Sequence, residues 1–503
     1  MECGAYWQPR RELVVNVQAT RNEVGQDWRE AVREAAYVAG RWTAEGEPIT
    51  VVNPSTGAVI GHIPSLSLEH VDRAIEAAAD AQPSWAARLP RERGDILMKW
   101  HDLIVANTDP LAALMTAEQG KPLDDARGEI AYGASFIRWF AEEASRIYGD
   151  VIPSHLPDRK MLVQKEPIGV VALVTPWNFP SAMLTRKAAA ALAAGCTAIC
   201  VPSLETPYSA LALAALAEQA GIPPGVFSVL TGEPELVVGR LCDSDIVRGL
   251  SFTGSTAIGR RLLARCAPTV KRVSLELGGH APFIVFPDVD VDAAAEAAVA
   301  AKFQTSGQDC LAANRIFVHD DILPAFVEAF AAKTAALAVG DGFDGKSTMG
   351  PLINDRAVAG VQRQVDDALA KGARLILGGQ PHPMGGRFFS PTVLTDISPD
   401  MAIMSEETFG PVAAILGFRD EAEVVRTANT TEYGLVAYVY TRDVSRAWRL
   451  SDALQYGMVA VNTVRLTGAP IPFGGIKHSG LGREGSRHGI EEYLNQKYVC
   501  MGV

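Results

Sequence analysis

The sequence predicts an α/β fold with at least two domains, and three observations lead to that prediction. Segments that read as strands alternate with segments that read as helices from about residue 161 to about 267, which is typical of a doubly wound nucleotide-binding domain. A second alternating series begins near VSLELGG (273–279) and runs to about 487. The length of 503 residues exceeds what a single hydrophobic core usually serves, so two or three domains are expected.

The part of the chain before the first alternating series is expected to be an arm followed by helices. Residues 1–26 are predicted to be a loosely ordered N-terminal extension. From 67 to about 145 the apolar spacing is helical, and Ser67 is placed to cap the first of these helices. The next stretch, 161–180, reads as extended strands that two prolines interrupt.

Strand and helix signals recur through both alternating series. In the first series Thr206 can cap a helix whose first residue is Pro207 and whose stop is Gly221. The other elements expected there are strands at 198–201, 226–230 and 249–254, and helices at 234–242 and from about 256. The second series repeats the pattern with a helix at 322–337 and strands at 311–318, 412–418 and 436–441.

Composition narrows the class of partner. Hydrophobic residues make up 48% of the chain and charged residues 21%, and no uncharged apolar run is long enough to span a membrane. A net charge of −12 and a pI near 5.3 disfavour non-specific binding to nucleic acid. We therefore expect a small-molecule substrate, with neither a membrane nor a nucleic acid as partner.

The number of cysteines and the first residues of the chain indicate the cellular compartment of the protein. Seven cysteines are few and odd in number, which favours reduced thiols, and none has zinc-ligand spacing, so no metal site is expected. The first residues contain acids at intervals and resemble neither a signal peptide nor a transit peptide. A cytoplasmic enzyme is the simplest interpretation.

GLGREG (480–485) matches a dinucleotide pattern, but it follows a polar stretch instead of a buried strand, so a structural loop is favoured.

Three short motifs carry the residue types that chemistry needs. Gly254, Ser255 and Gly259 stand at an expected strand-to-helix turn, which is either a phosphate-binding loop or an ordinary capped turn. Glu276 is a lone carboxylate between leucines on an expected strand; burial would raise its pKa towards that of a general base, unless it is a structural glutamate. Cys310 follows a polar turn and is either an exposed nucleophile or one more packing residue.

Six motifs taken together resemble the aldehyde dehydrogenase superfamily, and they match in order and spacing from about residue 40 to 503. They are TPWNFP (175–180), FTGST (252–256), LELGG (275–279), GQDC (307–310), EETFGPV (406–412) and PFGGIKHSGLGREG (472–485). The chain is most similar to the succinate-semialdehyde dehydrogenases. The resemblance implies oxidation of an aldehyde to a carboxylic acid, with NAD or NADP as cofactor.

The resemblance also implies roles for four catalytic residues. Cys310 would attack the carbonyl as a thiolate, and the Asn178 side chain with the Cys310 backbone N–H would hold the oxyanion. Glu276 would activate the water that hydrolyses the thioester, and Lys187 would help to order the site and the nicotinamide ribose. The residues expected at the cofactor are Thr175, Pro176, Trp177, Ser203, Gly254, Ser255, Gly259, Glu407 and Phe409.

The chain departs from the family pattern where the adenosine ribose is usually held. Val201 and Leu204 stand at positions that usually carry Lys and often Glu. Loss of hydrogen bonds to charged groups could cost roughly 1.5–3 kcal/mol each. We therefore expect weak cofactor affinity or an altered ribose contact through Ser203 or Glu205, and the choice between NAD and NADP stays open.

The substrate pocket departs as well. Succinate-semialdehyde enzymes hold the distal carboxylate with two arginines and a hydroxyl, and Arg186 and Thr467 match the first arginine and the hydroxyl. Gln304 replaces the second arginine, and Arg465 either supplies the missing charge or faces solvent. The expected substrates are succinate semialdehyde or a related ω-carboxy aldehyde, with a neutral aliphatic or aromatic aldehyde as the alternative. Ala312 removes a second cysteine that could form a regulatory disulfide.

The family fold implies a division of the chain and an oligomer. The expected parts are an N-terminal extension, a cofactor domain, a catalytic domain and an oligomerisation segment, at 1–26, 27–145 with 168–277, 278–487, and 146–167 with 488–503. The C-terminal alternation is typical of an edge strand, so a homodimer or homotetramer is expected. A non-catalytic protein of this fold, a cofactor-free thioesterase and a CoA-acylating enzyme are the weaker alternatives.

Overall fold

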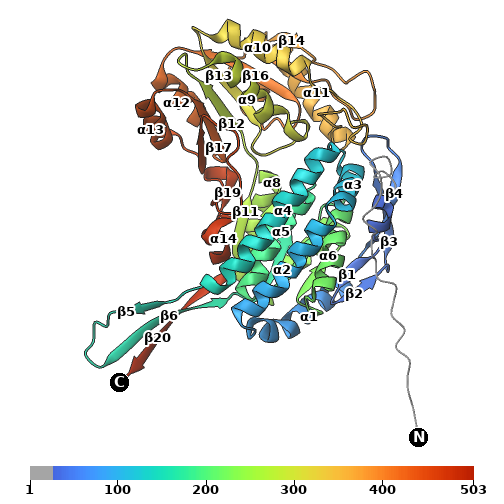
Figure 1. Cartoon of the computed structure of the whole chain (residues 1–503), viewed down its shortest axis with the longest axis vertical. Helices are drawn as coiled ribbons and strands as arrows, with labels where there is room; N and C mark the ends of the chain where they lie inside the picture. Colours follow the sequence, from blue (N-terminus) through green and yellow to red (C-terminus); the bar gives the residue numbers. More distant parts are fainter. Residues whose placement is uncertain (1–26) are drawn as a thin grey trace.

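The computed structural model describes residues 27–503, and the predicted N-terminal extension, 1–26, lies outside the described residues. Two large sheets, each covered by helices, form two α/β lobes, and a β arm projects from one lobe beside the C-terminus (Figure 1). The predicted α/β fold class is confirmed. Short 3-10 helices lie at Asp27–Ala31, Ala144–Arg146, Ala267–Thr269, Gln304–Gly307, Ala402–Met404 and Lys477–Ser479.

The first lobe is built on an eight-stranded sheet. In spatial order its strands are β19 (Gly480–Leu481), β11 (Arg272–Glu276), β10 (Val247–Thr253), β7 (Val170–Val174), β8 (Thr197–Val201), β9 (Phe227–Val229), β1 (Ala36–Val38) and β2 (Arg41–Thr43). The five strands from β11 to β9 are parallel. The chain runs outwards from β7 through β8 to β9 and then returns to β10 on the other side of β7. A crevice opens at such a reversal, at the carboxyl ends of the strands, and is where doubly wound sheets bind their ligands.

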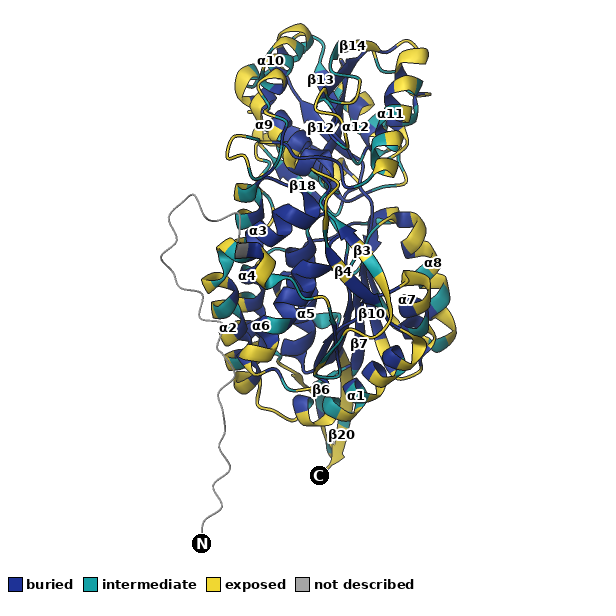
Figure 2. Ribbon diagram, turned by 90° about the vertical axis from the view of Figure 1, so that its right-hand side faces the viewer, coloured by how far each residue is buried: buried dark blue, intermediate teal, exposed yellow. Residues whose placement is uncertain are grey.

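Helices cover both faces of this sheet, so its central strands are buried (Figure 2). One layer contains α2 (Pro90–Ala106), α3 (Thr108–Gln119), α4 (Leu123–Glu143), α5 (Pro180–Ala194) and α6 (Pro207–Ala220). The other contains α1 (Leu68–Ala86), α7 (Pro234–Asp243) and α8 (Thr256–Cys266).

Proline and glycine set the ends of the two central helices. Both α5 and α6 have proline at their first position, where the missing N–H costs nothing, and end at Gly195 and Gly221 in the left-handed region. The sequence predicted the bounds of α6, including Thr206 as its N-cap residue, but the Thr206 hydroxyl donates to the Trp177 carbonyl instead of accepting from the helix backbone. The Ser67 hydroxyl likewise bonds the His70 ring at 2.8 Å and does not cap the backbone of α1.

The second lobe contains a seven-stranded sheet that is parallel except at one edge. In spatial order its strands are β14 (Arg374–Leu377), β15 (Thr392–Thr395), β16 (Val412–Phe418), β13 (Ala313–His319), β12 (Ala281–Val285), β17 (Val436–Tyr440) and β18 (Met458–Val461). Its helices are α9 (Val291–Phe303), α10 (Leu323–Ala335), α11 (Asp355–Ala370), α12 (Glu421–Asn429) and α13 (Val444–Ala453). After β18 the chain returns to the first lobe, where β19 pairs with β11 inside the eight-stranded sheet. β19 nevertheless falls within 278–487, the range predicted for the catalytic domain.

The projecting arm is a three-stranded sheet, in the order β20 (Leu494–Gly502), β6 (Arg159–Pro167) and β5 (Asp150–Ile152). β20 follows the short α14 (Ser486–Glu491) and pairs with β6 along its whole length, so the C-terminal strand lies at an edge, as its alternation predicts. A separate hairpin joins β3 (Glu47–Val52) to β4 (Val59–Ser65). No helix in residues 27–503 is both long and apolar enough to cross a membrane.

Candidate active site

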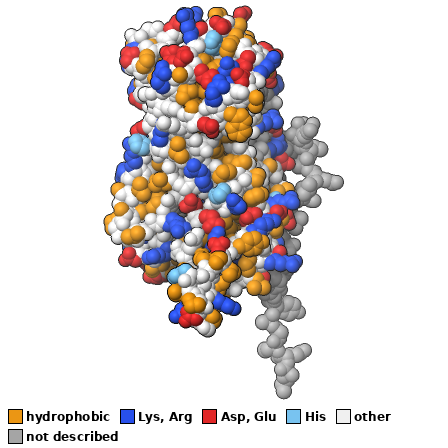
Figure 3. Space-filling view, turned by 90° about the vertical axis from the view of Figure 1, so that its left-hand side faces the viewer, with side chains coloured by type: hydrophobic (Ala, Val, Ile, Leu, Met, Phe, Trp, Pro, Cys, Tyr) orange, Lys and Arg blue, Asp and Glu red, His pale blue; other side chains and the backbone are white. Residues whose placement is uncertain are grey.

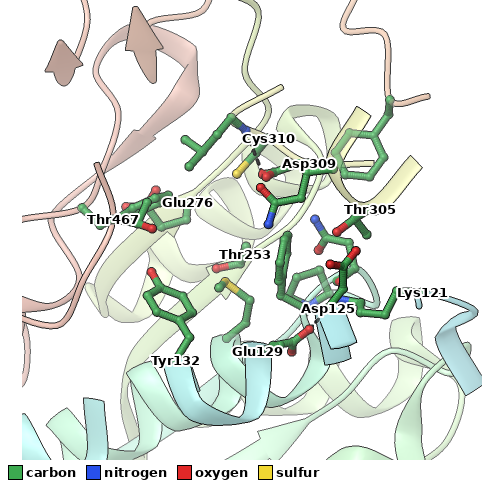
Figure 4. Close-up of a pocket in the computed structure, with 18 of the residues that line it drawn as sticks. Lys121, Asp125, Glu129, Tyr132, Thr253, Glu276, Thr305, Asp309, Cys310 and Thr467 are labelled. Atoms are coloured by element: carbon green, nitrogen blue, oxygen red, sulfur yellow. Dashed lines mark hydrogen bonds and ion pairs between the residues drawn. The ribbon is translucent and has the colours of Figure 1, made fainter. Parts of the chain in front are cut away.

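A cavity of about 690 Å³ lies at the carboxyl ends of the first lobe's strands and is closed on its other side by the second lobe. The segments after β7, β10 and β11 supply Asn178, Gly254 and Glu276, and the loop after α9 supplies Cys310. In Figure 4, Thr253 at the end of β10 and Glu276 at the end of β11 lie around the same space as Cys310. Three of the four residues predicted to be catalytic therefore line one cavity, although they come from different strands.

The loop that carries Cys310 is strained and tightly held. Thr305, Ser306 and Gly307 have φ values of 51°, 59° and 70°, in the left-handed region that side chains disfavour. The Ser306 hydroxyl donates to the Gly350 carbonyl at 2.7 Å, and a Cβ at Gly307 would collide with the Gly410 carbonyl. The second lobe thus fixes the conformation that presents the cysteine.

The groups expected to hold an oxyanion are directed to the same place. The Asn178 Nδ2 atom donates one hydrogen to the Gln308 carbonyl at 3.0 Å, which leaves its second hydrogen for a ligand. The Cys310 backbone N–H has no acceptor among residues 27–503. Asn178 is in turn held by Lys121, whose ammonium donates to the Asn178 carbonyl at 2.8 Å and pairs with Glu129 at 2.5 Å.

Glu276 ends β11 with a buried carboxylate whose two oxygens have no hydrogen-bond partner among the described residues. Its pKa is raised well above the usual range, mainly by burial and further by Glu484, while Arg186 and Lys187 oppose the shift. The sequence predicted this direction. A glutamate that serves structure would accept hydrogen bonds from its surroundings, so the unpartnered oxygens favour a role towards a ligand.

The thiol of Cys310 is partly buried, and the protein raises its pKa well above the usual range. Burial is the largest cause, followed by the carboxylates of Asp309 and Glu407, while Arg186 opposes the shift. The sequence left open whether this thiol is exposed and activated or is a packing residue. The described residues therefore favour the neutral thiol before a substrate binds, and formation of the thiolate needs a proton acceptor.

Lys187 does not line the cavity. It is fully buried behind the wall, where its ammonium donates to the Ser251 hydroxyl at 3.0 Å and to the Glu484 carboxylate. Glu484 also pairs with Arg186 at 2.5 Å. Glu484 belongs to the GLGREG stretch, so the loop that was predicted to be structural carries the carboxylate that holds both cations.

The residues predicted to bind the cofactor divide into two groups. Six of them line the cavity: Pro176, Trp177, Gly254, Ser255, Glu407 and Phe409. Thr175, Ser203 and Gly259 do not line it. Ser203 accepts a hydrogen bond from the Glu205 N–H, and Gly259 packs so closely on Leu277 that a Cβ would overlap its side chain.

The cavity fits a dinucleotide on its cofactor side. No side chain caps α8, so the N–H groups of its first turn face the crevice beside Ser255, as a phosphate requires. Glu407 accepts the Gly279 N–H at 2.8 Å, and burial raises its pKa to about 7. The Trp177 and Phe409 rings meet edge to face at 5.5 Å between centroids. The possible replacement for the missing ribose anchors, Glu205, is engaged with Asn354 at 2.7 Å.

All four residues predicted to bind the substrate line the cavity. Arg186 is buried, lies over the Phe473 ring and donates to the Met183 sulfur at 3.0 Å, and Tyr132 lines the cavity with it. Gln304 and Arg465 are exposed at the opening, and no carboxylate in residues 27–503 pairs with Arg465.

Several charged or polar lining residues were not predicted from the sequence. They include Lys121, Asp124, Asp125, Glu129, Tyr132 and Asp309. The first five lie at or near the start of α4, whose amphipathic pattern reads as an ordinary packed helix. Asp309 stands directly before the cysteine, and that adjacency was the available signal.

A doubly wound sheet that opens onto a cysteine, a carboxamide and a carboxylate defines an oxidoreductase of the aldehyde-oxidising class. The model of the aldehyde dehydrogenase family matches residues 42–499, and the chain belongs to this family. The predicted resemblance, enzyme class and type of cofactor, NAD or NADP, are confirmed. Family membership alone does not define the aldehyde.

Similar proteins include three bacterial enzymes. An aspartate-semialdehyde dehydrogenase (non-phosphorylating) of Halomonas elongata is 58% identical, over 94% of this chain and 96% of its own. A glutarate-semialdehyde dehydrogenase of Pseudomonas aeruginosa is 54% identical, over 93% and 98%. An NADP(+) succinate-semialdehyde dehydrogenase of Escherichia coli is 52% identical, over 94% and 98%.

Solved structures share the whole fold. The crystal structure of an NADP-dependent enzyme from Escherichia coli has a TM-score of 0.93 and 52% identity, and covers 94% of this chain and 99% of its own. A betaine aldehyde dehydrogenase of Staphylococcus aureus in complex with NAD+ has a TM-score of 0.92 and 33% identity, with coverage of 94% and 96%.

Proposed function

We propose that the protein oxidises an aldehyde that carries a carboxylate group, using NAD or NADP, and releases the corresponding acid. The observation that carries the proposal is the convergence of Cys310, Asn178 and Glu276 in one cavity whose recognition side holds Arg186 and Arg465. The similar enzymes named for aspartate, glutarate and succinate semialdehydes support a short ω-carboxy aldehyde.

In the proposed reaction the Cys310 sulfur attacks the aldehyde carbon and forms a thiohemiacetal. The free hydrogen of the Asn178 amide and the Cys310 N–H stabilise the negative oxygen. Loss of a hydride converts the thiohemiacetal into a thioester on Cys310, and a bound nicotinamide would supply the hydride acceptor. Glu276 then takes a proton from the water that hydrolyses this thioester. One aldehyde, one water and one oxidised cofactor give one carboxylate, one reduced cofactor and two protons.

The raised pKa values of Cys310 and Glu276 make proton transfer a necessary part of the proposed reaction. Because burial favours the neutral Cys310 thiol, the thiol proton must pass to an acceptor as the carbonyl is attacked. Glu276 is suited to this step and to activation of the water, since its carboxylate is buried and unpartnered. Lys187 acts indirectly, because its contact with Glu484 helps to fix Arg186 in the wall.

On the cofactor side, we assign the diphosphate to the N-terminus of α8 and the nicotinamide half to Trp177, Glu407 and Phe409. The uncapped first turn of α8 and the position of these three residues on the cavity wall support this assignment. Both NAD and NADP remain part of the proposal, because Val201 and Leu204 offer neither attraction nor repulsion to a 2′-phosphate. Thr175, Ser203 and Gly259 do not line the cavity. We therefore assign them to the shape of the backbone around the cofactor and not to direct contact with it.

The test is a matrix of aldehydes and cofactors with the purified protein. Succinate and glutarate semialdehydes and a neutral aliphatic and aromatic aldehyde are each combined with NAD and with NADP, and formation of reduced cofactor is followed at 340 nm. We expect carboxylated aldehydes to be oxidised with the higher kcat/KM. Faster oxidation of the neutral aldehydes would favour the alternative substrate class, and no turnover with any pair would contradict the proposal.

We further propose that the arm forms a dimer contact, as part of a homodimer or a homotetramer. Apolar side chains gather on the arm at the bottom of the view in Figure 3, and Val151, Tyr498 and Met501 are exposed there. The outer edge of β20 is unpaired within residues 27–503. Light scattering on a variant truncated after residue 493 should give a smaller oligomer than the full chain.

The proposed location is the cytoplasm, which fractionation of the source cells would test.

A further inference from the structure

Two aspartates that line the cavity have neither an ion-pair partner among the described residues nor a part in the proposed reaction. Asp125 lies near the start of α4, and Asp309 immediately precedes Cys310; both line the cavity (Figure 4). Neither forms an ion pair within residues 27–503. The N–H of Leu311 donates to Asp309 at 2.9 Å, and the Asp309 carboxylate contributes to the raised pKa of the Cys310 thiol. Burial raises the pKa of both aspartates, as expected of acids that lack a cationic partner.

The cations nearest to these acids are already engaged. Lys121 opposes the pKa shift of both aspartates, but its ammonium pairs with Glu129 and donates to the Asn178 carbonyl. Lys302 also opposes the pKa shift of Asp309, but it does not line the cavity and its ammonium donates to the Asn314 side chain at 2.8 Å. A substrate whose only charge is negative would therefore meet uncompensated negative charge beside the reacting thiol, where the low dielectric strengthens the repulsion.

The same cavity also contains positive charge that is available to a ligand. The Nη1 atom of Arg186 is buried and has no hydrogen-bond partner among the described residues, and the Arg465 guanidinium is unpaired within them. Gln304 is neutral where the family resemblance implies a second arginine. Although Arg186 is paired with Glu484 through its Nε atom, the cavity therefore offers guanidinium N–H groups and aspartates that lack a partner, and a ligand that satisfies both must carry an anion and a cation.

We propose that the substrate is the semialdehyde of an α-amino acid, with an ammonium and a carboxylate on the same carbon. Asp309 and Asp125 bind the ammonium, and Arg186 and Arg465 bind the carboxylate. The proposal rests on the proposed function and defines its substrate more narrowly. A four-carbon substrate suits the geometry, because its ammonium lies only two carbons from the carbon that Cys310 attacks, and Asp309 is the neighbour of that cysteine.

The matched pair for the test is aspartate semialdehyde and succinate semialdehyde, which differ only in the α-ammonium. With the wild-type protein we expect kcat/KM to be at least tenfold higher for aspartate semialdehyde. Equal values, or a preference for succinate semialdehyde, would overturn the inference and leave the proposed function intact.

Two variants assign the discrimination to the aspartates. Asp309→Asn and Asp125→Asn should each lower kcat/KM for aspartate semialdehyde and raise it for succinate semialdehyde, so that their ratio falls about tenfold or more. Asp80→Asn, an exposed aspartate on α1 that does not line the cavity, makes the same charge change and should leave the ratio within twofold. An equal fall for both substrates in the two variants would mean that the aspartates serve folding only, and would overturn the inference.

A binding measurement separates recognition from turnover. Cys310→Ala protein with bound cofactor is titrated calorimetrically with L-homoserine and with 4-hydroxybutyrate, the alcohols that correspond to the two aldehydes. We expect L-homoserine to bind at least tenfold more tightly, and Asp309→Asn in the same background to remove the difference. Tighter binding of L-homoserine without turnover of any aldehyde would contradict the proposed function alone. Equal binding of the two alcohols would contradict the inference.

Discussion

The reaction side and the recognition side of the cavity are built in different ways. Asn178 and Glu276 lie at or just after the ends of buried strands, and a strained loop presents Cys310. Gln304 and Arg465, on the recognition side, are exposed at the opening. The topology of the sheet fixes the position of the reacting residues, because parallel strands end at one edge. The choice of aldehyde depends instead on a few exposed side chains, which can change without cost to the fold.

The largest effect that tests this comparison is expected at the cysteine. Cys310→Ala should lower kcat by about 10⁴-fold or more, since the thiohemiacetal and the thioester both form on this sulfur. The measurement is the steady-state rate with the best aldehyde. Cys500→Ser is the matched control, because this thiol is exposed on β20. Retention of more than a few per cent of the rate by Cys310→Ala would refute covalent catalysis here.

The next effect concerns the oxyanion. Asn178→Ala should lower kcat by about 10²–10³-fold, because one donor to the developing negative charge is lost. Aldehyde KM should change much less, which distinguishes loss of transition-state stabilisation from loss of binding. Thermal unfolding of the variant provides the control for folding. A rate within threefold of the wild type would contradict the assignment.

The pair behind Asn178 should matter for stability. Lys121→Met removes the partner of the buried Glu129 and is expected to lower the free energy of unfolding by about 3–5 kcal/mol. Lys121→Met with Glu129→Met leaves no unpaired charge and should recover most of the loss. Denaturant unfolding of the two variants measures both values. A double variant no more stable than the single one would mean that packing, not charge, is responsible.

The pH profile tests the two raised pKa values on the reaction side. Cys310 and Glu276 act without their protons, so kcat/KM should rise with pH through neutrality and into the alkaline range. Glu276→Gln should be slower by about 10²–10⁴-fold, with thioester accumulating on the enzyme because its hydrolysis lacks a base. Acid quenching and mass spectrometry would detect that species. A wild-type rate that falls from pH 6 to 8 would contradict the predicted direction.

The cofactor side should show a smaller effect. Val201→Lys with Leu204→Glu introduces the ribose anchors that the chain lacks, and should lower KM for NAD about tenfold or more, given roughly 1.5–3 kcal/mol for each hydrogen bond to a charged group. KM for NADP should respond less, because the new carboxylate repels a 2′-phosphate. Unchanged values for both cofactors would show that the protein holds the ribose in another way.

The smallest effect is expected at the exposed arginine. Arg465→Gln should raise KM for carboxylated aldehydes about three- to tenfold, since solvent screens this guanidinium. KM for a neutral aldehyde should change less, and that difference is the readout. An equal change for both classes would assign Arg465 to the shape of the loop instead of to charge recognition.

Local sequence was sufficient for most elements, whereas the residues of the reaction were predicted through the family resemblance. The bounds of α6 follow from Pro207 and Gly221, but a lone acid between leucines left Glu276 open between a general base and a structural glutamate. Proline, glycine and apolar spacing act within a few residues, so the chain carries their effects wherever it lies. The same reasoning could not place Lys187 behind the wall, because its partner Glu484 is distant in the chain.

The sequence by itself determined the alternating α/β elements and the family, and through the family the cysteine, carboxamide and carboxylate that we propose for the reaction. Only the tertiary structure decided which charges are compensated. Lys121 and Arg186 are engaged by Glu129 and Glu484, and this leaves Asp125 and Asp309 unpaired in the cavity. The physical reason is that secondary structure depends on neighbours along the chain, whereas Coulomb energy depends on distance and burial in space.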